Sequence, residues 1–165
     1  MRILGIDPGT GRMGFGAIDC VGSKMTMVEY GCIETPAHME TSERLVIIFN
    51  KVKEIISRTK PDAVAVEKLF FAKNVTTVMS VGEARGVAVL AIALAGAKFA
   101  EFTPLQVKQA VTGYGRADKT QIQNMVKAIL SLDKIPKPDD AADALAIAIT
   151  CSTMNNSLLT SQNNK

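Results

Sequence analysis

Hydrophobic and polar positions alternate with a period of two through the first third of the chain. This alternation is typical of strands that have one buried and one exposed face. Three short strands are predicted, at residues 2–7, 13–19 and 25–32. Because the connections are short, as at Val21-Gly22-Ser23, we expect consecutive strands to pair in an antiparallel meander.

Beyond residue 40 the apolar residues recur at intervals of three and four, which is typical of helices packed on one side. Thr41 or Ser42 is expected to cap the first helix, and Thr103 with Pro104 is expected to begin a later one. The predicted helices span residues 41–58, 76–95, 104–111, 118–130 and 139–150. Two further strands are expected at residues 62–67 and 98–102. The first of them is apolar enough to be buried on both faces.

The order β-β-β-α-β-α-β-α-α-α predicts an α/β fold, in which helices flank a mixed five-stranded sheet. With 165 residues there is little room for a second domain, so we expect one domain over residues 1–151. Residues 152–165 are rich in Asn, Ser and Thr and predict a disordered tail.

Composition and charge exclude several classes of protein. Hydrophobic residues make up 47% of the chain and charged residues 21%, which is the balance of a globular protein. The longest apolar stretch, residues 86–97, is too short to cross a bilayer, and Asp7 and Pro8 interrupt any signal peptide. We therefore expect a cytoplasmic location. The net charge of +3 neither requires nor excludes a nucleic-acid partner.

Thiol and imidazole chemistry have little support. Cys20, Cys32 and Cys151 are widely spaced and form no CxxC pair, so we interpret them as reduced thiols without a role. His38 is the single histidine, which excludes histidine-rich metal sites, and no nucleophile motif accompanies it for a triad. Any chemistry therefore rests mainly on carboxylates and lysines.

Four acidic residues stand where charge is unexpected. Asp7 and Glu67 end two apolar strands, while Asp140 and Asp143 lie three apart on one side of the last helix. Strand ends of this kind open into one crevice, where α/β sheets place their sites. Crowded carboxylates repel one another unless a cation neutralises them, and oxygen ligands suit Mg²⁺ or Mn²⁺. Two such ions about 4 Å apart would serve displacement at a phosphodiester.

Each of these acids, taken singly, would also suit a purely structural role. Asp7 would suit the turn that follows it, and Glu67 is close in sequence to Lys68 and Lys73 as ion-pair partners. The two helical aspartates would be favourable at the positive end of the helix dipole. The combination of two strand ends with a helical pair is what favours an active site.

Three motifs together resemble the RuvC family of Holliday junction resolvases: Gly5-Ile6-Asp7-Pro8-Gly9, the strand end at Glu67, and residues 140–146 (Asp-Ala-Ala-Asp-Ala-Leu-Ala). The similarity runs from Met1 to about Cys151, with the order and spacing of the motifs kept. The resemblance implies a ribonuclease-H-like fold and a homodimer with two active sites. It also implies magnesium-dependent nicking of two like strands at a four-way DNA junction, in recombination and repair, which leaves 5′-phosphate and 3′-hydroxyl ends. A RuvA and RuvB type branch-migration complex would be the partner.

By this resemblance, Asp7, Glu67, Asp140 and Asp143 form the catalytic, metal-binding set, with two Mg²⁺ per site and Mn²⁺ as a substitute. Some members of the family carry His at the position of Asp140. Asp139 is adjacent to it, and we choose Asp140 because its spacing from Asp143 matches the family.

Candidate DNA contacts include an aromatic residue. Phe70 resembles the family's aromatic that lies near the crossover and stacks on unpaired bases. The alternative is that Phe70 and Phe71 are both core residues, but neighbours in an extended loop point in opposite directions, which favours an exposed Phe70. We also include nearby Lys73 among the candidate DNA-binding residues.

The basic residues point to the same kind of substrate. Lys108 and Lys119 resemble the family's functional lysines. Residues 104–127 contain four basic residues, which are these two lysines, Arg116 and Lys127. Asp118 is the single acidic residue in the same stretch. A basic stretch beside an acidic site fits a substrate whose phosphates are held while one is cut. A solvated helix face is the alternative, and it suits Lys127 better than Lys119. The Gly- and Ala-rich helix at residues 76–95 is a candidate dimer surface, or else a buried helix of the monomer.

Other functions compete with this hypothesis. Asp7-Pro8-Gly9-Thr10-Gly11 also resembles the first phosphate-binding turn of actin-like ATPases and sugar kinases, but those proteins use two such domains and this chain has room for one. Another ribonuclease-H-like nuclease, acting on RNA–DNA hybrids, is a second alternative. A non-catalytic junction-binding module is a third.

Overall fold

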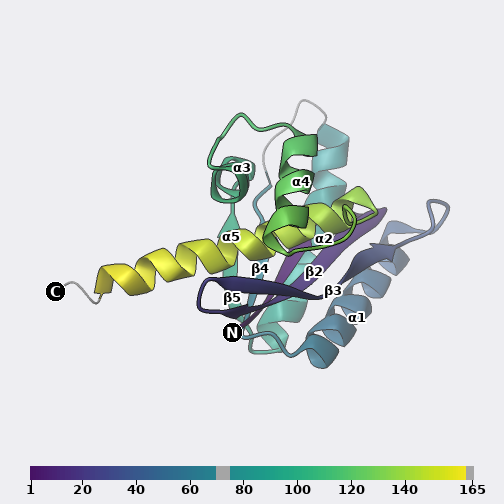
Figure 1. The fold of residues 1–165 in the computed structure, drawn as a ribbon. Coiled ribbons are helices and arrows are strands. Elements are labelled where there is room, and N and C mark those ends of the chain that lie inside the picture. Colours follow the sequence, from purple (N-terminus) through teal and green to yellow (C-terminus); the bar gives the residue numbers. More distant parts are fainter. Residues whose placement is uncertain (70–74, 163–165) are drawn as a thin grey trace.

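The computed structural model describes residues 1–69 and 75–162, and Figure 1 labels its elements. The strands are β1 (Arg2–Asp7), β2 (Arg12–Val21), β3 (Lys24–Glu34), β4 (Ala63–Glu67) and β5 (Lys98–Phe102). The helices are α1 (Thr41–Thr59), α2 (Val75–Leu94), α3 (Pro104–Thr112), α4 (Lys119–Ile129) and α5 (Asp139–Gln162). This order of elements confirms the predicted one.

The strands form one mixed sheet with the order β3-β2-β1-β4-β5. The first three strands pair antiparallel, and β4 lies parallel to both β1 and β5. Parallel neighbours need long crossover connections, which contain α1 and α2. The register pairs Ile6 with Val66, so the next residues, Asp7 and Glu67, end neighbouring strands at the same edge of the sheet.

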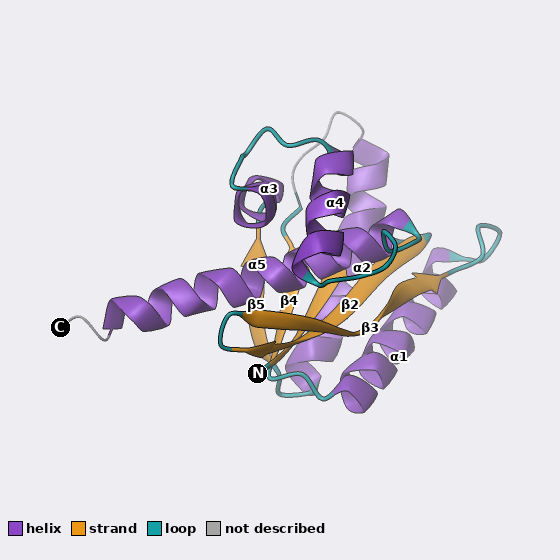
Figure 2. Cartoon of the chain, viewed as in Figure 1, coloured by secondary structure: helices purple, strands orange, loops and turns teal. Residues whose placement is uncertain are grey.

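Helices cover both faces of the sheet (Figures 1 and 2). Helices α1 and α2 pack on the face that holds Leu4 and Val64, and α3, α4 and α5 pack on the face that holds Ile3 and Ala65. Adjacent residues of a strand point to opposite faces, so β1 and β4 contribute to both hydrophobic clusters. Their central residues are fully buried, as predicted for β4.

Helix α5 crosses one face of the sheet at very close range. A Cβ atom added at Gly5 of β1 would lie 2.0 Å from the carbonyl oxygen of Ala144, and one added at Gly14 of β2 would lie 1.9 Å from that of Asp140. The small residues Ala141 and Ala144 are fully buried on the helix side of this contact. Glycine in the strands thus lets the α5 backbone rest directly on the sheet.

Two of the predicted helix starts are confirmed by their caps. The Thr103 hydroxyl accepts a hydrogen bond from the backbone N–H of Gln106, and Pro104 is the first helical residue of α3. Asp118 caps α4 in the same way through the backbone N–H of Gln121. In each case the glutamine side chain accepts from the backbone N–H of the cap residue and completes a capping box.

Two predictions at helix ends are wrong. Thr41 and Ser42 lie inside the first turn of α1, and the cap position is held by Glu40, which has extended backbone angles and makes no side-chain cap hydrogen bond. Helix α5 continues to Gln162, whereas the last helix was predicted to end at residue 150. Cys151 and Ser152 of this helix are buried. The division into a domain over residues 1–151 and a tail over residues 152–165 stays a prediction.

Candidate active site

A cavity of about 220 Å³ opens at the carboxyl ends of β1 and β4, on the α5 side of the sheet. It is lined by acidic, basic and apolar side chains: Asp7, Glu67, Asp143, Lys108, Lys119, Pro104, Val107, Ile122 and Ala146. The structure therefore brings together three of the four predicted acids and two of the predicted lysines.

Asp7 is held in this cavity by β1 and by the turn that follows it. The hydroxyl of Thr10 donates to the carbonyl of Ser80 in α2 over 2.6 Å, and the hydroxyl of Thr35 donates to the carbonyl of Thr10, also over 2.6 Å. Burial and, to a smaller extent, the negative charges of Glu67, Asp143 and Asp140 together raise the pKa of Asp7 to about 8. Asp7 without a cation is therefore largely protonated at neutral pH.

Glu67 follows the last buried residue of β4. Burial raises its pKa to about 7, and the charge of Asp143 contributes. Its backbone carbonyl accepts a hydrogen bond of 3.1 Å from Nε of Arg85 in α2. The neighbouring Lys68 is turned away, with its Nζ 2.9 Å from the carboxylate of Glu101. The alternative of a Glu67–Lys68 ion pair is thus not what the structure contains.

The acids of α5 differ from one another in their surroundings. Asp143 faces the cavity, and burial raises its pKa despite the positive charge of Lys119, whose Nζ lies 3.3 Å from its Oδ2. Asp140 is outside the cavity lining, with its Oδ2 3.6 Å from Nη1 of Arg12. Asp139 bonds to Lys137 and Lys119, and these hydrogen bonds lower its pKa to about 2. Asp140 thus acts on the site from its rim, through the pKa of Asp7.

The chemistry of the donor set fits a divalent cation. Three half-buried carboxylates, each with a raised pKa, line one cavity, and a cation would relieve both their desolvation and their mutual repulsion. Within residues 1–69 and 75–162, no group of three His, Cys, Asp or Glu side chains is close enough to enclose an ion as it stands.

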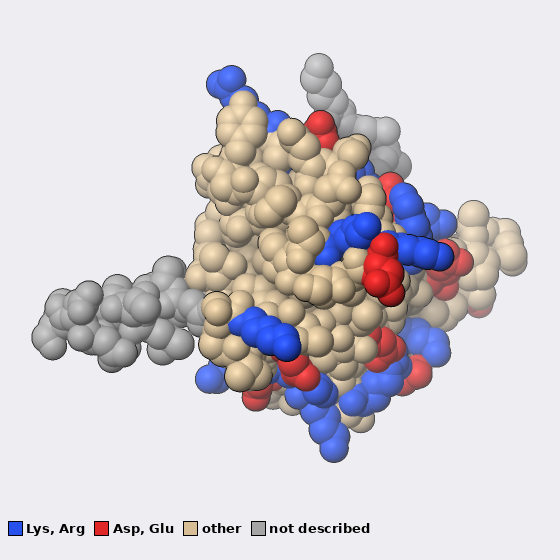
Figure 3. Space-filling view, in the orientation of Figure 1, with Lys and Arg blue, Asp and Glu red and all other residues tan. Residues whose placement is uncertain are grey.

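The predicted DNA-binding residues are found in different places. Lys108 of α3 and Lys119 of α4 line the cavity beside the acids. Arg116 lies in the turn before α4 and is not part of the lining. Phe70 and Lys73 lie outside the described residues. Figure 3 shows the molecule in the orientation of Figure 1. On the face drawn there, basic and acidic side chains are interleaved along the lower and right-hand rim, while the part around α3 is mostly uncharged.

Two arginines at the site were missed at the level of sequence. Arg12 pairs with Asp140, and Arg85 binds the backbone of Glu67. A sequence signal for Arg85 did exist, because it is the single basic residue in the apolar helix at residues 75–94. Arg12 carries no comparable signal.

A larger cavity of about 740 Å³ lies at the opposite edge of the sheet, between the carboxyl ends of α1 and α2. Its lining includes Lys53, Lys60 and Lys98 but a single acid, Asp62, which accepts a hydrogen bond from the backbone N–H of Arg2. This cavity lacks paired carboxylates, so the smaller one is the candidate active site.

None of the helices in the described ranges is both long and apolar enough to cross a membrane.

Residues 3–151 match the family described as Crossover junction endodeoxyribonuclease RuvC. The protein of that name from Desulfitobacterium hafniense is 58% identical over 149 residues, which cover 90% of this chain and 90% of the relative.

Solved structures agree with the sequence match. Thermus thermophilus RuvC has a TM-score of 0.89 at 36% identity, and the same protein in complex with a Holliday junction substrate has a TM-score of 0.91 at 35% identity. Each comparison covers 95% of this chain and 96% of the solved one. The fold is accordingly ribonuclease-H-like, and the chain belongs to the RuvC family of crossover junction endodeoxyribonucleases.

Proposed function

We propose that this protein resolves four-way DNA junctions in homologous recombination and DNA repair, by symmetric, Mg²⁺-dependent nicking of two like strands. The observation that carries the proposal is the cavity in which Asp7, Glu67 and Asp143 meet beside Lys108 and Lys119. Acids from β1, β4 and α5 offer oxygen ligands, and the lysines offer contacts for phosphates. Membership of the RuvC family supports the same activity.

Asp7, Glu67 and Asp143 would hold Mg²⁺, with Asp140 as a further ligand from the rim. Two ions per site is our expectation, and Mn²⁺ would substitute for Mg²⁺. When bound, the metal supplies positive charge to the attacking water and to the phosphate. The raised pKa values of Asp7 and Glu67 mean that proton release accompanies metal binding at neutral pH.

The reaction is hydrolysis of a phosphodiester. The oxygen of water bonds to phosphorus and the bond from phosphorus to the 3′ oxygen breaks, which leaves 5′-phosphate and 3′-hydroxyl ends. Lys108 and Lys119 would hold the phosphates beside the acids. Arg116 and Lys73 would contact the backbone farther out, and Phe70 would stack on an unpaired base near the crossover.

Wild-type protein with Mg²⁺ is expected to cut a synthetic mobile four-way junction at paired positions and to leave ends that DNA ligase can seal. Linear duplex of the same sequence and an RNA–DNA hybrid are expected to be cut at least about a hundredfold more slowly. The measurement is a cleavage time course on denaturing gels, with EDTA as the control. Equal cutting of the hybrid would indicate the alternative ribonuclease-H-like nuclease. Binding without any cutting would indicate a junction-binding module.

Paired cuts need two active sites, and residues 1–69 and 75–162 form one cavity of this kind. We propose a homodimer that pairs through α2. Met79, Leu90 and Leu94 are 65%, 53% and 67% exposed and lie on one side of this helix, where Gly86 has open space around it. An exposed apolar stripe of this kind marks an interaction surface, and glycine allows a partner helix to approach closely.

The double variant Leu90→Glu with Leu94→Glu is expected to weaken dimerisation by about thirtyfold or more, since it places charge in an apolar interface. Light scattering after size exclusion, over a range of protein concentrations, measures the effect. Val46→Glu, on an exposed apolar residue of α1, is the matched control and should remain a dimer. A double variant that stays dimeric at all concentrations would place the interface elsewhere.

Two further parts of the proposal concern the cellular setting. A RuvA and RuvB type branch-migration complex would deliver the junction, a partner that the family relationship supports. We also infer a cytoplasmic location, because a junction-cutting nuclease must reach the chromosome.

A further inference from the structure

Arg85 joins three separate segments of the chain behind the candidate active site. It is carried by α2, its Nε donates to the backbone carbonyl of Glu67 over 3.1 Å, and its Nη2 donates to Oε2 of Glu101 in β5 over 2.5 Å. The side chain is 21% exposed, and it does not line the cavity. Arg85 thus contacts the main chain of a proposed metal ligand without facing the proposed substrate.

The backbone at Glu67 lies where the sheet ends. The register between β1 and β4 stops at the pair of Ile6 and Val66, so Glu67 lies one residue beyond it. On the other side, the N–H of the next residue, Lys68, donates to the carbonyl of Phe102 over 2.8 Å. The Glu67 carbonyl accepts its hydrogen bond from a side chain, that of Arg85, which restrains the chain at this point.

Glu101 fixes Arg85 in this position. Its Oε1 lies 2.9 Å from Nζ of Lys68, and its Oε2 accepts from Arg85. Glu101 therefore links Lys68 to Arg85, and Arg85 in turn binds the main chain of Glu67. We call these contacts the Arg85 network. A planar guanidinium can bond in two fixed directions at once, whereas the single nitrogen of a lysine cannot reproduce that geometry.

We propose that Arg85 is a positioning residue, which holds the main chain of Glu67 so that its carboxylate is aimed at Asp7 and Asp143 for metal binding. This inference rests on the proposed function, because it concerns the same site. Residues that orient metal ligands from behind typically contribute about tenfold to a hundredfold to metal affinity or activity.

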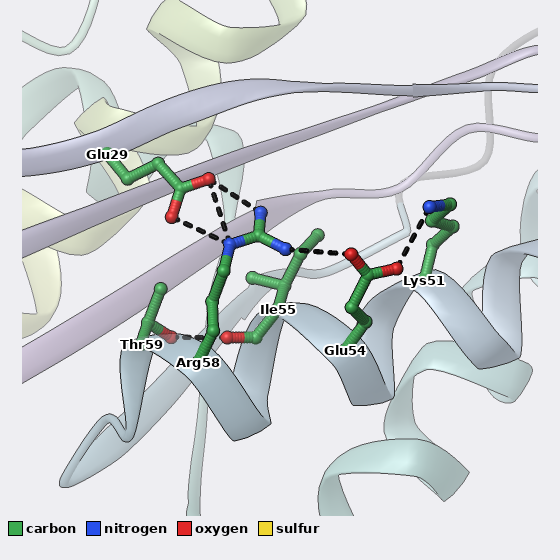
Figure 4. A network of polar contacts seen from close by, with 6 residues as sticks. All are labelled: Glu29, Lys51, Glu54, Ile55, Arg58 and Thr59. Atoms are coloured by element: carbon green, nitrogen blue, oxygen red, sulfur yellow. Dashed lines mark hydrogen bonds and ion pairs between the residues drawn. The ribbon is translucent and has the colours of Figure 1, made fainter.

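The test compares Arg85→Lys with Arg58→Lys. Arg58 is a matched control, because it too is a multidentate arginine, donating to Glu29 of β3 and Glu54 of α1 (Figure 4). It lies outside the cavity lining, so its replacement changes a comparable network elsewhere. The readouts are the Mg²⁺ concentration for half-maximal junction cleavage, the rise in melting temperature on adding Mg²⁺, and junction affinity in Ca²⁺.

For Arg85→Lys we expect the half-maximal Mg²⁺ concentration to rise about tenfold and the Mg²⁺-induced rise in melting temperature to shrink. Junction affinity should remain within about twofold of wild type, since Arg85 is absent from the cavity lining. Arg58→Lys should leave all three readouts unchanged. Wild-type Mg²⁺ dependence in Arg85→Lys, or the same change in both variants, would overturn the inference.

Glu101→Gln provides a second variant should Arg85→Lys fail to fold, because it removes the charge that anchors Nη2 and keeps the arginine. It should shift the Mg²⁺ dependence in the same direction by a smaller factor, and an unchanged Mg²⁺ dependence would contradict the positioning role. Failure of the proposed function is a different result: the wild-type protein would not cut junctions, or Glu67→Gln would cut them at the wild-type rate.

Discussion

Junction cleavage by the Asp7→Asn variant is expected to be about a thousandfold slower than cleavage by the wild-type protein. Asparagine keeps the size of the side chain but removes a carboxylate that would bind Mg²⁺ in the cavity. The charge stabilisation that metals supply at phosphoryl groups is worth several kcal/mol, and loss of about 4 kcal/mol corresponds to this change in rate. Junction binding should persist, because Lys108 and Lys119 remain in place.

The same substitution is expected to stabilise the protein in EDTA at pH 8, by about 2 kcal/mol or more in the free energy of unfolding. Burial and the neighbouring acids raise the pKa of Asp7 from 3.8 to about 8. The folded wild-type protein therefore binds more protons than the unfolded chain between about pH 4 and pH 8, and its stability falls as the pH rises through this window. Asparagine cannot ionise, so the variant does not lose the stability that ionisation of Asp7 costs the wild-type protein.

Three measurements check these effects. Single-turnover kinetics give the cleavage rate, electrophoretic mobility shifts in Ca²⁺ give junction binding, and urea unfolding at pH 5 and pH 8 gives the stability. Asp133→Asn is the control, since it makes the same chemical change at an exposed position between α4 and α5. It should keep the wild-type rate and the wild-type slope of stability against pH. Cleavage by Asp7→Asn at the wild-type rate would contradict the metal-site proposal. A wild-type slope of stability against pH in this variant would mean that Asp7 is not protonated in the metal-free site.

Gly5→Ala is expected to destabilise the protein by about 3 kcal/mol or more. The new Cβ atom would lie 2.0 Å from the carbonyl oxygen of Ala144 and 2.8 Å from the backbone nitrogen of Ala148. Both are backbone atoms of α5, so no side-chain rotation can relieve the overlap, and the helix must move away from β1. Because Asp143 is carried by the same helix, cleavage should also fall.

Urea unfolding in EDTA measures this effect, with Gly82→Ala as the matched control. A Cβ atom at Gly82 would meet only the end of the Leu69 side chain, at 3.4 Å, and alanine is favoured over glycine within a helix by up to about 1 kcal/mol. The control is therefore expected to be neutral or stabilising. An equal urea midpoint for Gly5→Ala and wild type would show that α5 does not rest on β1 as tightly as the structure has it.

Much of the fold follows from local pattern, and the exceptions have physical reasons. The two-residue alternation predicts the first three strands, and the cap residue Thr103 with Pro104 predicts the start of α3, because both signals act over a few residues. The end of α5 was predicted too early, because the polar residues after Cys151 carry no local signal for a helix. The start of α1 was misplaced because two hydroxyl residues follow the true cap position.

The candidate site divides in the same way. Asp7, Glu67 and Asp143 were predicted because each is a charge beside an apolar run, and the structure brings them to one cavity. Asp140 has the same sequence pattern, yet it lies at the rim beside Arg12, because a spacing of three on a helix fixes a side but not a depth. The Arg85 network joins residues of α2, β4 and β5, which meet only because β4 pairs with β5.

The sequence by itself determined the order of the elements, the family and the acids that carry the proposed chemistry, because these depend on residue type and short-range spacing. The tertiary structure alone decided how close α5 lies to β1 and β2, which acids share the cavity, and which arginines stand behind them. These features depend on contacts between distant segments, where a missing Cβ at Gly5 or Gly14 sets a distance that no local pattern records. The raised pKa of Asp7 likewise arises only when burial and three other acids meet around it.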